Sequence, residues 1–485
     1  MAEKSIKKNY IYNVSYQLLT LITPFITAPY LSRVLGVDGV GTVSYSESVV
    51  SYFCLFATLG ITLYGQREIS YVQDDRIKRS HVFWETKILQ MITSAVVLAV
   101  YVPFCLFQQR YIIYMILSLN LFAVITDVSW FFQGLEEFGK IVFRNLIQKV
   151  LMIICIFVFI RSSSDLNIYI LISALFPVIG NITLWFYLPS YVAGPRLKTI
   201  HPVRNIRTIM SLFIPTIAIQ IYTVLDKTMI GLITQSDAEN GYYEQAIKIS
   251  RMLLAVVTAL GTVMNPRVGH YFGKKDTEKI NELMYRAYRF VWSISIPLCF
   301  GLVSVSAHFV PWFFGPGYDK VIPLMSILSF LLLAIGINNI TGVQYLIPTG
   351  RQNTFTKTVI MGAAVNLVLN IILITRFQSI GAAVSSVTSE TLIALVQFFI
   401  IRRELKIGKI FASCIPYLIS GTVMLVILKA VGMYLEATIL NTVILVISGA
   451  FIYIGMLLIM RDSFFIGNIK SLPKLLTKKE AHKNE

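Results

Sequence analysis

Residues 438–460 read TILNTVILVISGAFIYIGMLLIM, a stretch without any charged side chain. A bilayer core needs about 20 helical residues to cross it, so this stretch predicts a membrane-spanning helix. Apolar stretches of this kind recur along the whole chain. We therefore expect about fourteen spanning helices, at residues 11–33, 40–64, 83–108, 112–134, 142–160, 167–190, 206–234, 243–265, 288–313, 321–347, 356–375, 380–401, 411–431 and 438–460.

The composition also indicates a membrane protein. Of the 485 residues, 56% are hydrophobic and 14% are charged, and the mean hydropathy is +0.70. These values lie outside the usual composition of water-soluble domains. The five cysteines stand singly in apolar stretches, without a CxxC pattern or a neighbouring histidine pair, so no metal or redox site is expected.

Connections rich in lysine and arginine alternate with connections that have few of them. This is the pattern of multi-pass proteins, whose cytoplasmic loops carry an excess of these residues. This alternation places both termini, and the long connections 65–82 and 266–287, on the cytoplasmic side. It also accounts for the net charge of +17, which in a soluble protein would suggest nucleic-acid binding. We expect no nucleic-acid partner.

A faint internal repeat suggests two related halves. VGTVSYSES at 40–48 resembles NGYYEQAIK at 240–248, since each joins a glycine to a tyrosine and a glutamate where a helix begins. The expected fold is an all-α integral membrane protein with two six-helix lobes. The N-lobe would cover 1–190 and the C-lobe 191–405, followed by two helices in 406–462 and a basic cytoplasmic tail in 463–485.

Ionisable side chains inside spanning helices are costly, at about 2.5 to 3.5 kcal/mol each at the helix centre. Three of them, Glu244, Lys248 and Arg251, share one helical face through their i, i+4, i+7 spacing. Asp226 and Lys227 lie inside the predicted helix 206–234. Each of these residues needs a partner, a hydrated cavity or a function.

Two further charges lie at the start of the chain, where Arg33 ends the first predicted helix and Glu47 belongs to a polar stripe on the second. Charges thus concentrate in the first, second, seventh and eighth helices, which suggests a hydrated cleft suited to a phosphate-bearing headgroup. The alternative is that Glu244 with Lys248, and Asp226 with a neighbour, form intramembrane ion pairs that hold helices together. Arg33, near a helix end, could instead extend to the membrane interface. The predicted substrate-binding residues are Arg33, Glu47, Lys227, Lys248 and Arg251.

Three carboxylates are candidates for binding a coupling H⁺ or Na⁺, because intramembrane acids often do so. They are Asp226, Glu390 in the SSVTSET stretch, and Asp127 in the fourth helix. Glu390 could instead accept hydrogen bonds from serine or threonine hydroxyls on neighbouring helices.

The sequence does not indicate an enzyme. GLEEFGK at 134–140 has the glycine and lysine spacing of a phosphate-binding loop, but Ile141 replaces the required serine or threonine. No nucleophile or metalloprotease motif is present, and the histidines are isolated. We expect a transporter without a bound cofactor.

Several stretches resemble the oligosaccharide flippases of the polysaccharide transporter family, within the multidrug/oligosaccharidyl-lipid/polysaccharide exporter superfamily. The resemblance covers nearly the whole chain. It is carried by LSRVLGVDGVGTVSYSESVVSYF (31–53), WFFQGLEEFGKIVFRNLIQK (130–149), YTVLDKTMIG (222–231), QYLIPTGRQNTFTKTVIMGAAVNLVLN (344–370) and GAAVSSVTSE (381–390).

The resemblance implies two six-helix lobes arranged as a V and an alternating-access flippase of the bacterial cytoplasmic membrane. It implies that the cargo is an undecaprenyl-diphosphate-linked oligosaccharide repeat unit for surface polysaccharide, and that a polysaccharide polymerase and other assembly proteins are partners. It also implies that the predicted substrate-binding residues and Asp226 lie on helices lining a central cavity. A lipid II flippase and a cation-coupled multidrug exporter of the same superfamily are the alternatives.

Overall fold

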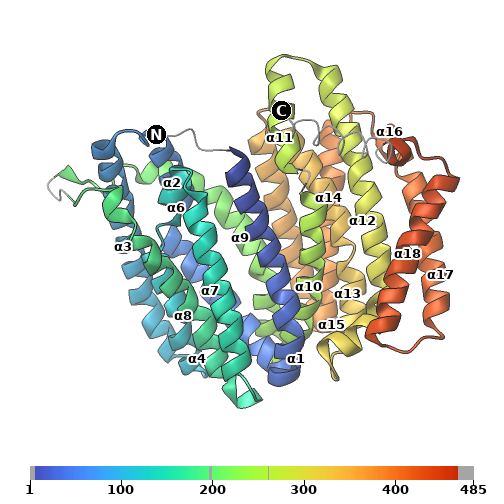
Figure 1. Ribbon diagram of the computed structural model, residues 1–485, viewed down its shortest axis with the longest axis horizontal. Helices are drawn as coiled ribbons and strands as arrows, with labels where there is room; N and C mark the ends of the chain where they lie inside the picture. Colours follow the sequence, from blue (N-terminus) through green and yellow to red (C-terminus); the bar gives the residue numbers. More distant parts are fainter. Residues whose placement is uncertain (1–5, 196–198, 260, 468–485) are drawn as a thin grey trace, which may run out of the picture. The chain divides into compact units, whose positions relative to one another are not determined.

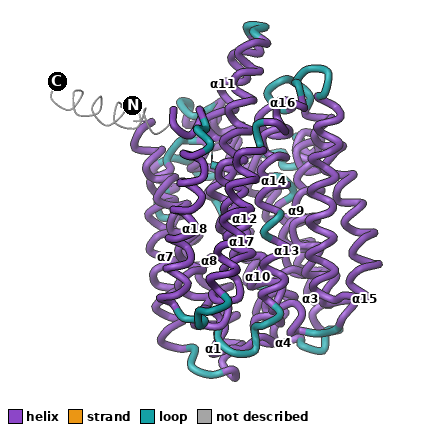
Figure 2. Tube along the Cα trace, turned by 90° about the vertical axis from the view of Figure 1, so that its right-hand side faces the viewer, coloured by secondary structure: helices purple, strands orange, loops and turns teal. Residues whose placement is uncertain are grey.

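The computed structural model describes residues 6–195, 199–259 and 261–467, and within these ranges the regular structure is helical throughout, without a strand (Figures 1 and 2). Packing divides the chain into two compact units, residues 1–244 and 245–485. The predicted tail at 463–485 lies outside the described residues from 468 onward. The predicted lobe boundaries and the V arrangement stay predictions.

Unit 1 is built from long helices that run side by side (Figure 1). Its helices are α1 (Ile6–Thr58), α2 (Ile61–Tyr71), α3 (Arg76–Leu106), α4 (Tyr111–Leu117), α5 (Leu119–Thr126), α6 (Ser129–Gly134), α7 (Phe138–Phe159), η1 (Ser163–Asp165), α8 (Leu166–Trp185), η2 (Leu188–Ser190), α9 (Ile206–Thr234) and the first part of α10 (Asp237–Thr258).

The long helix α1 contains a break at Gly36, where φ is 69° and ψ is 179°. A positive φ of this kind is readily adopted by glycine, which has no Cβ. The break falls in the gap predicted between helices 11–33 and 40–64, so the two predicted helices follow each other across a single residue. The second of them ends at Thr58, because Leu59 (φ 46°) and Gly60 (φ 70°) take left-handed conformations.

The span predicted at 112–134 is confirmed as the apolar segment Tyr111–Gly134, but this segment is not one continuous helix, because it consists of α4, α5 and α6. At the second junction, Asp127 is extended and its Oδ1 accepts a hydrogen bond from the Ser129 backbone N–H at 2.8 Å. The N-cap residue of α6 is Val128, so the Asp127 carboxylate, one residue earlier, satisfies the first backbone N–H of α6. The sequence gives no glycine or proline signal for the break, which is why the apolar pattern alone missed it.

Unit 2 continues the same architecture (Figure 1). Its helices are the rest of α10, α11 (Gly261–Gly273), α12 (Thr277–Phe314), α13 (Val321–Leu328), α14 (Leu331–Asn338), the π-helix η4 (Asn339–Leu346), α15 (Gln352–Ile401), α16 (Ile407–Ala412), α17 (Ile415–Gly432) and α18 (Ile439–Ile459). The predicted connections 65–82 and 266–287 are largely helical, since α2, α11 and the start of α12 occupy them.

Among the residues that the structure describes, ten helical segments are long and apolar enough to cross a membrane. Two of them, 22–71 and 352–401, are 50 residues long, more than twice the length that a crossing requires. Each contains a break, at Gly36 and at Gln378 (φ 55°). The helices α9 and α10 add 29 and 22 residues. The structure therefore confirms an all-α multi-pass membrane fold and accommodates the predicted count.

Candidate functional site

Two glycines bring α1 and the start of α10 into close contact within unit 1. A Cβ on Gly41 would lie 1.7 Å from the Asp237 carbonyl oxygen, and a Cβ on Gly241 would lie 2.2 Å from the Val37 carbonyl oxygen. No other residue type can occupy either position without moving backbone. These two glycines come from the two stretches that the internal repeat pairs, so the repeated segments pack against each other.

This contact places Ser44 of α1 beside Glu244 of α10, with the serine Oγ donating to Glu244 Oε2 at 3.1 Å. The same carboxylate oxygen lies 2.5 Å from Lys227 Nζ of α9, and both charged side chains are 16% exposed. Because little solvent reaches this ion pair, the two charges depend on each other. Loss of either partner leaves a charge without its counter-ion. We call Ser44, Asp226, Lys227, Tyr243 and Glu244 the lysine cluster.

Asp226 contributes the second carboxylate of the lysine cluster. It is buried, and its Oδ2 accepts a hydrogen bond from the Tyr243 hydroxyl at 2.5 Å. One helical turn away, the hydroxyls of Ser48 and Thr228 lie 2.9 Å apart, and Thr228 Oγ1 lies 3.1 Å from Tyr52 Oη. Hydroxyl and carboxylate groups thus form a continuous polar strip along the facing sides of α1, α9 and α10.

Arg110 closes one end of this strip and was not predicted. Its guanidinium binds Asp237 Oδ2 at 2.6 Å and donates to Thr42 Oγ1 at 2.9 Å. The hydrogen bond to Asp237 raises the pKa of Arg110. Arg110 lies in a connection rather than in a spanning stretch, so a search limited to charges within helices could not have found it. The pair joins the connection before α4 to the start of α10.

The structure brings together Lys227, Asp226 and Glu244, and it distributes the other predicted residues differently. Arg33 and Glu47 are exposed on α1. Lys248 and Arg251 follow on the part of α10 that belongs to unit 2. Their assignment to substrate binding stays a prediction.

Asp127 is not part of the lysine cluster. Its carboxylate binds the first backbone N–H of α6, a local role that its sequence position did not reveal. Next to it is Lys87, which is fully buried on α3. The Lys87 ammonium donates to the carbonyl oxygens of Ile125 (2.5 Å) and Asp127 (2.8 Å) and to Gln90 Oε1 (3.0 Å). Lys87 therefore satisfies backbone carbonyls that the break between α5 and α6 leaves without helical partners. Coupling through Asp127 stays a prediction.

Glu390 has a defined partner in unit 2. Asn338, at the end of α14, donates from Nδ2 to Glu390 Oε2 at 2.5 Å and to the Glu390 carbonyl oxygen at 3.0 Å. The Asn338 Oδ1 atom is buried and receives no hydrogen bond within the part of the chain that the structure describes. The π-helix η4 begins at the next residue, and such irregular turns often occur at functional sites. This arrangement supplies oxygen atoms near the middle of unit 2.

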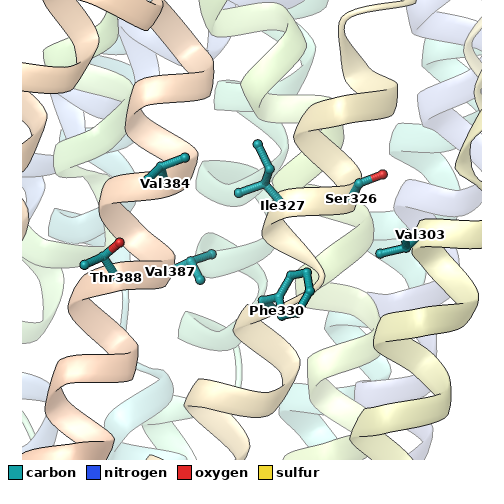
Figure 3. Close-up of a pocket in the computed structure, with 7 residues that line it drawn as sticks. All are labelled: Val303, Ser326, Ile327, Phe330, Val384, Val387 and Thr388. Atoms are coloured by element: carbon teal, nitrogen blue, oxygen red, sulfur yellow. The ribbon is translucent and has the colours of Figure 1, made fainter. Parts of the chain in front are cut away.

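Unit 2 also has a shallow hollow of about 350 Å³ between α12, the α13–α14 segment and α15. It is lined by Val303, Ser326, Ile327, Phe330, Val384, Val387 and Thr388, with the α15 valines on the side opposite Ile327 and Phe330 (Figure 3). Ser326 donates to the Ile322 carbonyl oxygen of its own helix. The hollow therefore presents an almost wholly apolar surface, which suits hydrocarbon chains rather than a charged headgroup.

No group of three or more His, Cys, Asp or Glu side chains is placed to hold a metal ion among residues 6–195, 199–259 and 261–467. The predicted coupling cation therefore rests on single carboxylates with amide or hydroxyl neighbours, such as Glu390 with Asn338.

Comparison with known protein families assigns the chain to a family. The model of the polysaccharide biosynthesis protein family matches residues 6–272, which is more than half of the sequence. The chain belongs to the polysaccharide biosynthesis protein family. The MatE family also matches, over residues 211–375.

Relatives agree with this assignment. The putative O-antigen transporter of Escherichia coli strain K12 is 24% identical over 407 residues, which cover 82% of this chain and 97% of that protein. Among solved structures, the lipid II flippase MurJ in an inward closed conformation is similar, with a TM-score of 0.71 and 16% identity over 94% of this chain and 99% of that one.

An inward-facing multidrug-resistance transporter of the MATE family is also similar, with a TM-score of 0.64 and 13% identity over 82% of this chain and 95% of that one. These relatives and structural neighbours are membrane transporters or flippases rather than enzymes, and the family member described here shares their multi-pass helical fold, as the sequence stretches predicted.

Proposed function

We propose that the protein flips undecaprenyl-diphosphate-linked oligosaccharide repeat units from the inner to the outer leaflet of a bacterial cytoplasmic membrane, with both of its termini in the cytoplasm. The cargo would serve surface-polysaccharide biosynthesis, and a polysaccharide polymerase and other assembly proteins would take it up. The relative named a putative O-antigen transporter supports this cargo class.

The observation that carries the proposal is the Lys227–Glu244 pair at 2.5 Å, in which each side chain is 16% exposed. An ammonium group is a good ligand for phosphate oxygens, and a charge-assisted hydrogen bond of this kind contributes about 1.5 to 3 kcal/mol. In the structure, Glu244 is paired with the Lys227 ammonium group. A diphosphate competes with Glu244 for Lys227, so binding of the cargo replaces the Lys227–Glu244 ion pair by a Lys227–phosphate pair and leaves Glu244 without this counter-ion.

Coupling to an H⁺ or Na⁺ gradient is part of the proposal, through Asp226 and Glu390. Asp226 lies next to Lys227 in the chain, and its hydrogen bond to Tyr243 ties α9 to α10. A cation on Glu390 would compete with the Asn338 amide for the carboxylate and would gain the buried Asn338 Oδ1 as a second oxygen ligand. Cation binding at either carboxylate would change the contacts between helices.

The test is transport in liposomes that hold a fluorescent undecaprenyl-diphosphate oligosaccharide, with the label in the outer leaflet destroyed by an impermeant reductant. The wild type and Lys227→Gln are compared with Lys274→Gln, which removes the same charge from an exposed position after α11. The expected result is flipping by the wild type and the Lys274 variant, with a loss of roughly 10- to 100-fold for the Lys227 variant, which corresponds to one charge-assisted hydrogen bond.

Normal flipping by Lys227→Gln would overturn the proposed role of the lysine cluster in binding the diphosphate. If the wild type moves no oligosaccharide lipid but moves lipid II, the first alternative function replaces the proposal. If it moves only cationic dyes, the multidrug exporter replaces the proposal.

A further inference from the structure

A second site lies in unit 1, away from the lysine cluster. A surface groove of about 310 Å³ runs between α7 and α8. Its lining includes Lys140, Arg144, Ile147 and Leu151 of α7, and Phe176 and Ile179 of α8. We call this the α7–α8 groove. It plays no part in the transport proposal and does not depend on it.

The α7–α8 groove is basic at one end and apolar along the rest. Lys140 and Arg144 lie in the first two turns of α7, while Leu151 lies 11 residues beyond Lys140. At 1.5 Å per residue this distance is about 16 Å, close to half of a bilayer core about 30 Å thick. The basic end is the predicted cytoplasmic end of α7. The groove therefore has the length of one membrane leaflet.

The basic side chains are held in place by their neighbours. Lys140 Nζ contacts the Tyr191 hydroxyl, lies 4.1 Å from the centre of the Tyr191 ring, and is 3.9 Å from Glu137 Oε2. The Arg144 guanidinium donates to Asn181 Oδ1 at 2.5 Å and to Asn145 Oδ1 at 2.7 Å. Lys140 and Arg144 thus lie at this end of the groove, with the Glu137 carboxylate beside Lys140.

A glycine keeps the middle of the groove open. A Cβ on Gly180 would lie 2.2 Å from the Gln148 side-chain oxygen, so any larger residue would push that side chain outward. Beyond it, Ile147, Leu151 and Ile179 are each more than 40% exposed. These side chains form an apolar wall of the groove, and the rest of the described chain covers each of them only in part.

We propose that the α7–α8 groove binds one anionic phospholipid of the cytoplasmic leaflet. Its phosphate lies against Lys140 and Arg144, and one acyl chain follows Ile147, Leu151 and Ile179. The leaflet-length apolar wall requires a hydrocarbon chain, which free phosphate lacks. Each basic side chain near an anionic lipid surface contributes about a fivefold gain in affinity, so the pair contributes about thirtyfold.

The test is native mass spectrometry of the full chain in detergent, titrated with phosphatidylglycerol or phosphatidylcholine of the same chains, with and without inorganic phosphate. The double variant K140Q/R144Q is compared with K274Q/R403Q, which removes one lysine and one arginine from exposed positions outside the groove. Thr183→Trp fills the groove and leaves both bases intact.

The wild type and K274Q/R403Q are expected to retain one phosphatidylglycerol in preference to phosphatidylcholine, and phosphate does not displace it. K140Q/R144Q and Thr183→Trp lose that preference, by about thirtyfold for the first. Because Arg144 also binds Asn181, K140Q alone is measured too, and about a fivefold loss is expected. Equal binding of the two lipids, displacement by phosphate, or wild-type binding by Thr183→Trp overturns the proposal.

Discussion

Replacement of Gly41 by alanine tests the packing that forms the lysine cluster. The new Cβ would lie 1.7 Å from the Asp237 carbonyl oxygen and 2.8 Å from the Gly241 backbone nitrogen. Ordinary contact begins near 3.4 Å, so α1 and α10 must separate locally by about 1.7 Å. The Ser44–Glu244 hydrogen bond, at 3.1 Å, cannot survive such a displacement.

The cost follows from overpacking, which in well-packed interiors is about 1 to 3 kcal/mol or more. Since both clashing atoms belong to the backbone, we expect the upper part of that range. For a unit of this size, 1 kcal/mol corresponds to about 2–4 °C, so the apparent Tm should fall by roughly 5–10 °C. Flipping should fall as well, because Glu244 moves away from Ser44.

The assay is thermal unfolding in detergent together with flipping in liposomes. The matched control is Gly455→Ala in α18, where a Cβ meets nothing within 4 Å. That variant should equal the wild type or be slightly more stable, because alanine favours helix over glycine. A Gly41→Ala protein with wild-type Tm and flipping would refute the close contact of α1 with α10.

Three further outcomes are expected. Lys87→Met should lower the apparent Tm by more than an exposed Lys274→Met, because it leaves buried carbonyl oxygens unsatisfied at about 1–3 kcal/mol each; equal Tm values would contradict the capping role. Burial opposes ionisation of Glu404, but hydrogen bonds from Arg351 and Tyr345 outweigh it and lower the pKa of Glu404. This stabilisation is present above the ordinary glutamate value of 4.5 and is lost as pH falls below it, so Tm should drop more steeply in acid for the wild type than for Arg351→Gln, and parallel curves would contradict it. Glu390→Gln should abolish stimulation of flipping by an imposed H⁺ or Na⁺ gradient while flipping without a gradient continues, and unchanged stimulation would exclude Glu390 from coupling.

Much of the fold follows from the sequence, because the bilayer imposes length and polarity on each helix. The span predicted at 206–234 coincides with α9, and the gap between the first two predicted helices contains the Gly36 break. Helix ends outside the bilayer were harder to predict. There α2, α11 and the start of α12 are helical without a long apolar stretch, since amphipathic packing rather than lipid contact determines them.

The candidate site was only partly predictable. Asp226, Lys227 and Glu244 stood out because charge in an apolar helix is costly. Their partners did not, since the Lys227–Glu244 pair joins two helices whose relative rotation no periodicity fixes. Lys87 could have been noticed by the same charge argument, because Gln90 follows it at i+3 inside the apolar stretch that begins at residue 83. Arg110 gave no such signal.

The most direct test of the central proposal is the rate at which the reconstituted protein exposes undecaprenyl-diphosphate oligosaccharide in the outer leaflet, for the wild type, Lys227→Gln and Lys274→Gln. The proposal predicts flipping by the wild type and the Lys274 variant and a loss of roughly 10- to 100-fold for the Lys227 variant. Flipping at the wild-type rate by Lys227→Gln, or no flipping of this lipid by the wild type, would contradict it.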